Sequence, residues 1–369
     1  MSETSDSRGA ERPVPETDVP ETTPAPRSAQ PEREILPFYQ WMDKVPGGLM
    51  LIPLVLGSIV GTFGTGFLEL GSFTTALFAD SALPLIALLI FATGTQVTIR
   101  TSGPVLATAG AVLLTKTIIP GLLVIGLGWI VGLDGILGIS ILGLLAMIDN
   151  SNGGLWLAFT GRYGDKRDRG AYVASAINDG PFFTMLFLGA SGLADIPFLM
   201  LLGAIIPFLL GMFIGNVNPR WRDIVKPTAA IVIPFFAFAL GTGIDLGAVV
   251  RGGASGLVAA AILSPFTGFL VYLGYKFLLR RGYRSGIGFA AGTTAGNAIA
   301  TPAIVAAADP QFAPYVDTAT AQVAAAVLVS AILAPLIASW VLKKEGGLLS
   351  EQEIAQLDEM DLGVSEPQL

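Results

Sequence analysis

Long stretches of apolar residues recur along this chain from Leu49 to Leu342, separated by short polar segments. A helix that crosses a membrane needs about 20 mostly apolar residues. Ten stretches reach this length, so the pattern predicts ten transmembrane helices. They lie at residues 48–65, 82–99, 104–131, 135–160, 170–190, 194–216, 228–244, 253–279, 285–307 and 315–342.

Two of these stretches are interrupted by glycine and polar residues. The fourth contains "DNSNGG" at 149–154, and the ninth contains "GTTAGNAIATPA" at 292–303. Free backbone groups are tolerated at bilayer depth only where protein buries them or where they line a watery cavity. A broken helix also offers N–H groups at the positive end of its second half. The two breaks predict a pocket for an anion with hydroxyl groups; ordinary kinks between packed helices are the alternative.

The chain also contains an internal repeat. "FATGTQVTIRTSG" starts at Phe91 and "FALGTGIDLGAVVRGG" starts at Phe238, an offset of 147 residues that also places Asn150 on Asn297. Each half holds five predicted spans, and an odd number gives the two halves opposite topology. Inverted repeats with paired interrupted helices indicate a secondary transporter. We therefore predict an all-α polytopic membrane protein of ten helices in two inverted five-helix repeats, at 45–192 and 193–342.

The two ends of the chain differ in composition from the rest. Residues 1–40 are rich in proline and acidic side chains, which predicts a disordered cytoplasmic tail. Phe38, Tyr39 and Trp41 are typical of an anchor at the membrane interface. The acidic tail at 343–369 holds Ser350 and Glu353 at the spacing of a capping box, which leaves a short helix and an irregular tail both open.

Orientation follows from lysine and arginine, which gather in cytoplasmic loops. With ten spans and a cytoplasmic N-terminus, the outer loops hold Arg251 alone. Both termini are therefore predicted to be cytoplasmic. The inner side collects Lys44, Arg100, Arg162, Lys166, Arg167, Arg169, Arg220, Arg222, Lys226, Lys276, Arg280, Arg281, Arg284, Lys343 and Lys344.

From about Val45 to Trp340 the chain resembles the 2-keto-3-deoxygluconate permease family. The resemblance rests on long, specific strings: "VPGGLMLIPLVLGSIVGTF", "GSFTTALF", "LLTK", "NSNGG", "NDGPFFTM", "SGLADIPF", "IPFFAFALGTGIDL", "TTAGNAIATPA" and "TATAQVAAA". It implies a proton-coupled importer of this sugar acid in the bacterial inner membrane. It also implies kinship with bile-acid-type transporters and sodium–proton antiporters.

In those relatives the broken helices 4 and 9 cross in a core domain that moves against a panel domain. By span, the resemblance assigns spans 3–5 and 8–10 to the core and spans 1, 2, 6 and 7 to the panel. A glutamate in span 9 helps to hold sodium in the sodium-coupled relatives. This chain has no acidic residue between Arg284 and Asp309, which argues against the same sodium chemistry.

Three ionisable residues lie deep within predicted spans or at the break in one, where charge is costly and usually functional. Lys116 is expected to pair with Asp149 or Asp179, to face the substrate carboxylate, or to form a structural salt bridge. Asp149 is a candidate ion-coupling residue or a cap on the second half-helix. Asp179, flanked by apolar residues, is the favoured proton carrier or a partner for N–H groups freed near Gly180. Asp245, farther out, is expected to be a surface cap.

The predicted site combines both breaks with these charges. The candidate ion-coupling residues are Asp179 and Asp149. The candidate substrate-binding residues are Asn150, Ser151, Asn152, Gly153, Thr294, Asn297, Thr301, Gln322 and Lys116.

The absence of histidine and cysteine narrows the function classes. A proton relay must use a carboxylate or a lysine, and neither a thiolate metal site nor an enzyme's histidine base is available. An intramembrane enzyme is therefore a weaker interpretation than a transporter. A channel is weaker too, because inverted repeats with interrupted helices indicate alternating access. No cofactor, metal or nucleic-acid partner is expected. The expected partners are a sugar-acid anion and the lipid bilayer; a homo-oligomer is left open. The coupling ion is expected to be a proton, with a sodium-coupled organic-anion transporter of the bile-acid type as the alternative.

Overall fold

The computed structural model describes residues 38–44, 48–98, 103–243 and 246–360, and in these residues every regular element is a helix. The first half contains α1 (Phe38–Lys44), α2 (Gly48–Phe63), α3 (Thr65–Leu68), α4 (Ser72–Phe78), α5 (Ala82–Thr95), α6 (Gly103–Leu113), the π-helix η1 (Leu114–Ile118), α7 (Ile119–Val131), α8 (Ile141–Ile148), α9 (Gly153–Tyr163), α10 (Lys166–Gly170), α11 (Tyr172–Ile177) and α12 (Phe182–Ala190).

The second half begins with α13 (Phe198–Val217), α14 (Arg220–Val225), α15 (Thr228–Thr242), α16 (Leu246–Leu273) and the π-helix η2 (Gly274–Leu278). It continues with the 3₁₀ helices η3 (Gly282–Ala291) and η4 (Gly296–Ala300), α17 (Thr301–Ala308), the 3₁₀ helix η5 (Pro310–Tyr315), α18 (Val316–Glu345) and α19 (Glu351–Met360).

Each of the ten predicted spans coincides with one or more of these helices, so the all-helical class is confirmed. Within the described residues, four helical segments are long and apolar enough to cross a membrane: 103–131, 198–217, 252–278 and 310–345. A fifth is formed if α4 and α5, which meet at a 60° bend, are taken as one span. The other predicted spans consist of shorter or interrupted helices.

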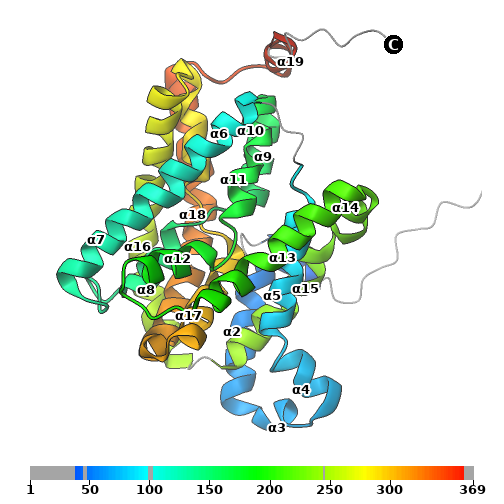
Figure 1. Ribbon diagram of the computed structural model, residues 1–369, viewed down its shortest axis with the longest axis vertical. Coiled ribbons are helices and arrows are strands. Elements are labelled where there is room, and N and C mark those ends of the chain that lie inside the picture. The colour runs from blue at the N-terminus through cyan, green and yellow to red at the C-terminus, as the bar shows by residue number, and fades with distance from the viewer. Residues whose placement is uncertain (1–37, 45–47, 99–102, 244–245, 361–369) are drawn as a thin grey trace, which may run out of the picture. The chain divides into compact units, whose positions relative to one another are not determined.

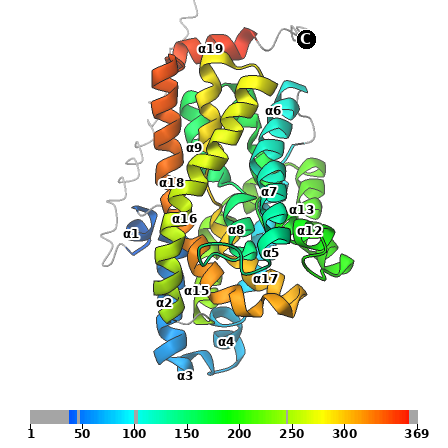
Figure 2. The ribbon, with the colours of Figure 1, turned by 90° about the vertical axis from the view of Figure 1, so that its left-hand side faces the viewer.

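The helices pack in two groups (Figures 1 and 2). The first group, which we call the panel, consists of α2, α5, α13 and α15. In the second group, which we call the core, α16 and α18 pack along each other and against η3, with α6 to α9 beside them. The same division follows from the family resemblance.

Glycines let the panel helices approach to backbone contact. On α2, a Cβ atom at Gly57 would lie 2.1 Å from the Phe238 carbonyl oxygen of α15, and one at Gly61 would lie 2.1 Å from that of Thr242. Both distances are shorter than any van der Waals contact. Only glycine therefore allows this packing, as in other close-packed membrane helices.

The α13–α5 pair repeats this contact. A Cβ atom at Gly211 of α13 would lie 2.0 Å from the Phe91 carbonyl oxygen of α5, and one at Gly215 would lie 2.2 Å from that of Thr95. Phe91 and Thr95 are the repeat partners of Phe238 and Thr242 at the 147-residue offset. The two copies of the repeated string thus receive equivalent pairs of glycines.

Both predicted helix breaks are present and they touch each other. The first separates α8 from α9 at residues 149–152, and the second separates η3 from η4 at residues 292–295. The Asn152 backbone N–H donates to Thr293 Oγ1 at 2.9 Å, and the Thr294 hydroxyl donates to the Met147 carbonyl oxygen at 2.9 Å.

A buried group of charges joins the far end of α9 to the start of η3. We call Asp165, Asp168, Arg281 and Arg284 the charged cluster. Arg281 Nη2 lies 2.6 Å from Asp165 Oδ2 and 2.8 Å from Asp168 Oδ1, and Arg284 donates to the Tyr163 carbonyl oxygen at 2.7 Å. Burial raises the pKa of Asp168 to about 6. Burial acts the same way on Asp165, but Arg281 and a backbone hydrogen bond outweigh it and hold its pKa below the ordinary range.

At the two ends, the structure tests different parts of the sequence interpretation. Residues 1–37 lie outside the described residues, as do Arg100 and Asp245, while Phe38 to Lys44 form the helix α1. At the other end, Ser350 and Glu353 exchange hydrogen bonds between side chain and backbone. The capping box therefore forms and starts α19.

Candidate functional site

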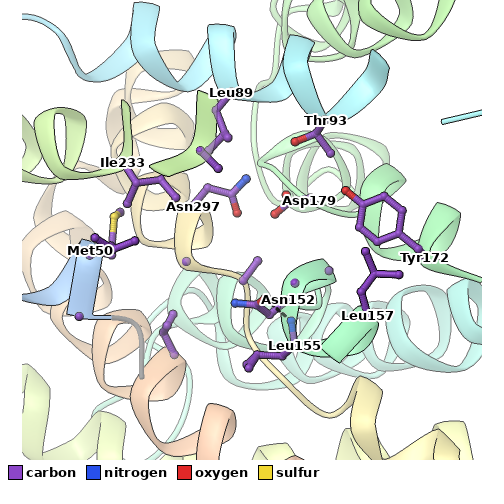
Figure 3. Close-up of a pocket in the computed structure, with 18 of the residues that line it drawn as sticks. Met50, Leu89, Thr93, Asn152, Leu155, Leu157, Tyr172, Asp179, Ile233 and Asn297 are labelled. Atoms are coloured by element: carbon purple, nitrogen blue, oxygen red, sulfur yellow. Dashed lines mark hydrogen bonds between the residues drawn. The ribbon is translucent and has the colours of Figure 1, made fainter. Parts of the chain in front are cut away.

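A pocket of about 520 Å³ lies where the two breaks of the core face the panel (Figure 3). Its walls come from α2, α5 and α15 on one side and from α9, α11, η4 and α18 on the other. Most of the lining is apolar. The polar groups and glycines in it are Thr93, Asn152, Gly153, Gly154, Tyr172, Asp179, Gly296 and Asn297.

The N-terminus of α9 opens into this pocket. Asn152 is its N-cap, and its side-chain oxygen accepts a hydrogen bond from the Leu155 N–H. The next two residues, Gly153 and Gly154, line the pocket. The first N–H groups of a helix have no partner within it and carry the positive end of the dipole. The pocket wall is therefore suited to hold a carboxylate here.

The side chain of Asn297 places a buried amide group in the pocket wall. It is 6% exposed, and neither its amide nitrogen nor its amide oxygen has a partner at hydrogen-bond geometry among the described residues. In Figure 3 the amide points toward Asp179, close enough for the two polar groups to interact. A buried polar group without a partner costs about 1–3 kcal/mol. A ligand with hydroxyl groups would remove that cost.

The predicted site residues fall into three sets. Asn152, Gly153, Asn297 and Asp179 line the pocket. Thr301 and Gln322 are buried at other places. Directly behind the pocket wall, in the crossing of the two breaks, lie Asn150, Ser151, Thr294, Asp149 and Lys116.

Asn150 joins the two breaks. Its amide nitrogen donates to the Ala146 carbonyl oxygen at 2.7 Å and to Asp149 at 3.0 Å. Its amide oxygen accepts from the Ala295 N–H at 2.7 Å. All of these partners are protein groups, so the first role of Asn150 is to hold the crossing together. Its predicted contact with substrate stays a prediction.

Ser151 and Thr294 also bond within the protein. The Ser151 hydroxyl lies 2.9 Å from that of Ser175 and 3.3 Å from Asn178 Oδ1. The Thr294 N–H donates to Ser330 Oγ at 2.9 Å. These bonds fix the backbone of the two breaks rather than exposing side chains to the pocket.

The two charges behind the wall have fixed partners as well. The Asp149 carboxylate accepts hydrogen bonds from the Thr184 hydroxyl and the Asn150 amide. Lys116 Nζ donates to the Ile148 carbonyl oxygen at 2.8 Å and to Thr267 Oγ1 at 3.4 Å. Of the predicted acids, Asp179 is therefore the one in the pocket wall.

Gln322 and Thr301 lie apart from the pocket. The Gln322 amide nitrogen donates to the Gly138 carbonyl oxygen at 2.9 Å and to Ser255 Oγ at 3.0 Å, which places it near the α7–α8 loop. Thr301 is the first residue of α17 and is buried.

Sequence reasoning missed Thr93 and Tyr172, which face the pocket in Figure 3. Thr93 belongs to the repeated string "FATGT", a signal that we used for topology and not for chemistry. Tyr172 starts α11 and packs on the N-terminus of α9, where a Cβ atom at Gly153 would lie 2.6 Å from its ring. That contact joins residues 19 positions apart and leaves no local pattern.

A second cavity of about 380 Å³ continues the pocket. The two share Leu89, Thr93, Leu157, Tyr172 and Ala229. The second cavity extends to Gln96, Val225 and Lys226, at the end of α14. A path thus leads from the broken helices toward a loop that carries lysine and arginine.

A bundle of apolar helices, with a pocket that combines an apolar lining with a few polar groups at two crossing helix breaks, is the architecture of a multi-pass membrane transport protein. The comparison with known proteins agrees. The model of the 2-keto-3-deoxygluconate permease family matches residues 39–347. The chain belongs to this family, is a transporter and is not an enzyme.

The alignments with named relatives of this family span nearly the whole length of each relative. "2-keto-3-deoxygluconate permease 1" of Salmonella typhimurium is 40% identical over 304 residues, which is 82% of this chain and 95% of that protein. The 2-keto-3-deoxygluconate permease of Xanthomonas oryzae pv. oryzae is 38% identical over 302 residues, covering 80% and 94%. That of Pectobacterium carotovorum subsp. carotovorum is 37% identical over 304 residues, covering 81% and 95%. The sequence resemblance is confirmed.

Proposed function

We propose that this protein is a proton symporter that imports 2-keto-3-deoxygluconate, or a similar sugar-acid anion, by alternating access. The observation that carries the proposal is one pocket that holds the N-terminus of α9, the buried amide of Asn297 and the carboxyl of Asp179. The names of the relatives support the substrate.

The chemistry of a sugar acid matches this pocket. Its carboxylate would lie at the N–H groups of Gly153 and Gly154, where the α9 dipole is positive. Its hydroxyl groups would bond Asn297, Thr93 and Tyr172. The volume of about 520 Å³ is in the range of small-molecule sites. The core and the panel both contribute, so relative motion of the two groups would open and close the site.

Proton coupling would run through Asp179. Moving one negative charge inward against the membrane potential costs about 2.3 kcal/mol per 100 mV. One proton carried with the anion cancels that charge, and a pH gradient then drives uptake. Asp179 supports this role because it lines the pocket beside Asn297, whereas Asp149 already has protein partners.

We also propose that the chain forms ten spans in two inverted repeats, with both termini cytoplasmic. The equivalent glycine contacts of Phe91 and Phe238 support the repeat, because the same string packs in the same way in each half. The lysine and arginine distribution supports the orientation. In that orientation the second cavity, which reaches Lys226, opens toward the cytoplasm.

Uptake into proteoliposomes tests the proposal, with the pH gradient, the sodium gradient and the voltage each set separately. We expect labelled 2-keto-3-deoxygluconate to accumulate above equilibrium under an inward proton gradient without sodium. Accumulation that follows only the sodium gradient would instead identify a sodium-coupled organic-anion transporter. Uptake that never exceeds equilibrium would contradict proton-coupled transport.

A further inference from the structure

Lys116 is a buried cationic residue that the proposed substrate and proton sites do not use. It is 1% exposed and lies in the π-helical turn η1, in the middle of the helical segment 103–131. A π-turn carries one extra residue and often marks a functional position. A buried ammonium group in a membrane is costly, so its surroundings must compensate for the charge.

The hydrogen-bond partners of the Lys116 ammonium group are oxygen atoms. Lys116 Nζ donates to the backbone carbonyl of Ile148, at the C-terminal and therefore negative end of α8, and to the hydroxyl of Thr267. The negative charge of Asp149, the next residue after α8, attracts it as well. Carbonyl, hydroxyl and carboxylate oxygens together form the ligand set of a hard metal cation.

The other carbonyl groups at this end of α8 are bonded by neutral groups. Asn150 donates to Ala146, the Thr294 hydroxyl to Met147 and the Thr117 hydroxyl to the Asp149 carbonyl. The Ile148 carbonyl is bonded by the charged donor Lys116. Half-helix C-termini and unwound carbonyl groups are the elements with which transporters bind coupling cations.

We propose that the Lys116 ammonium group is a tethered cation that occupies, permanently, the place of a dissociable coupling cation at the end of α8. The inference rests on the proposed transport function. It explains how the Ile148 carbonyl and the Asp149 carboxylate, at the crossing of the two breaks, can have a positive charge beside them without bound sodium. The mobile positive charge of the cycle is then the proton alone.

The test uses two variants that both remove the positive charge of Lys116; one also removes the volume of the side chain and the other keeps it. Lys116→Ala leaves space for an ion beside Ile148 and Asp149. Lys116→Met removes the charge but fills the space. Each variant and the wild type are measured in choline and in sodium buffer, both for uptake under a fixed pH gradient and for melting temperature in detergent.

We expect the wild type to give the same uptake and melting temperature in both buffers. Lys116→Ala should lose uptake by about tenfold or more in choline, because the buried Asp149 carboxylate loses the positive charge near it. It should recover uptake and melt at a higher temperature in sodium. Lys116→Met should lose uptake and gain nothing from sodium.

Three results would overturn the proposal: a wild type that needs sodium or melts higher in it, a Lys116→Ala variant that is fully active in choline, or one that sodium neither stabilises nor reactivates. If Lys116→Ala does not fold in either buffer, sodium has not replaced the tether, and the proposal fails. The comparison of melting temperatures in choline and sodium buffer needs no substrate. It therefore tests the tethered cation even if the wild type transports no sugar acid. That second result would refute the proposed function and not the tethered cation.

Discussion

At the scale of single residues, Asn150 and Asn297 show what a sequence repeat can and cannot tell. The 147-residue offset predicts that they are equivalent. In the structure, Asn150 bonds the two breaks to each other, whereas neither amide atom of Asn297 has a partner at hydrogen-bond geometry in the described part of the chain. The sequence finds the positions, but a hydrogen-bond partner 145 residues away decides the role.

The two asparagines are therefore expected to respond differently to alanine. Asn297→Ala should weaken binding of 2-keto-3-deoxygluconate about tenfold, the typical effect of one lost hydrogen bond, with the melting temperature nearly unchanged. Asn150→Ala should lower stability by about 1–3 kcal/mol, because the Ala295 N–H and the Ala146 carbonyl lose their partner.

Isothermal titration calorimetry and thermal melting of both variants check this, with Asn218→Ala, an exposed position outside the pocket, as the control. Unchanged affinity in Asn297→Ala would remove that side chain from the site. An Asn150→Ala variant as stable as the wild type would mean that its hydrogen bonds do not hold the crossing together.

At the scale of elements, composition predicts where helices break but not which form replaces them. Glycine and polar residues located both interruptions. The segment before the second break is the 3₁₀ helix η3. The π-turn η1 holds Lys116, whose ammonium group contacts the end of α8 at the first break. The 3₁₀ helix packs closely against a distant segment, because Gly288 of η3 lies against the backbone of α16. Such contacts join distant segments and are invisible in local sequence.

Glycine packing within the panel makes a second prediction. Gly215→Ala should destabilise the protein by about 1–3 kcal/mol, because the added methyl group overlaps the Thr95 carbonyl of α5. Gly203→Ala, on the same helix, meets no atom within 4 Å and should be neutral or stabilising by up to about 1 kcal/mol. Thermal melting of the two variants in one detergent checks the contrast; equal effects would refute close α5–α13 packing.

The charged cluster makes a third prediction, which depends on pH. Arg281→Met leaves Asp165 and Asp168 buried without their main partner, so we expect a loss of about 3–5 kcal/mol near pH 7. Arg281 is the strongest of the groups that lower the pKa of Asp165, so that pKa should rise when Arg281 is removed. The folded variant then binds protons that the wild type does not bind, so the deficit should shrink as pH falls from 7 toward 4.

Melting curves across this pH range test the charged cluster. Arg280→Met is the matched control, because Arg280 is the neighbouring arginine and is exposed. A deficit for Arg281→Met that is the same at pH 7 and pH 4, or that equals the effect of Arg280→Met, would contradict the assigned ion pairs.

At the scale of the whole molecule, the sequence predicted the helical class and the family, because these depend on composition and long motifs. The pocket itself combines α5, α9, α11 and η4. Its apolar wall residues, such as Leu89 and Ile233, look like any membrane-facing residue in the sequence. Which of them face the solute is decided by tertiary packing alone.

Orientation can be measured directly because the natural chain has no cysteine. Lys226→Cys, at the mouth of the second cavity, should react with a membrane-impermeant maleimide in inside-out vesicles and not in right-side-out vesicles. Asp134→Cys, in the exposed α7–α8 loop, should show the reverse pattern. Labelling of both from one side would contradict the proposed topology.

The central claim is that one pocket couples a sugar-acid anion to a proton through Asp179. Asp179→Asn in proteoliposomes tests it most directly, with pH-driven accumulation and substrate exchange at equal pH measured on the same preparation. Because the amide keeps the shape of the carboxyl but does not bind and release a proton in this pH range, we expect accumulation to disappear and exchange to remain largely intact. A variant that still accumulates 2-keto-3-deoxygluconate under a pH gradient, with the wild-type pH profile, would contradict the account.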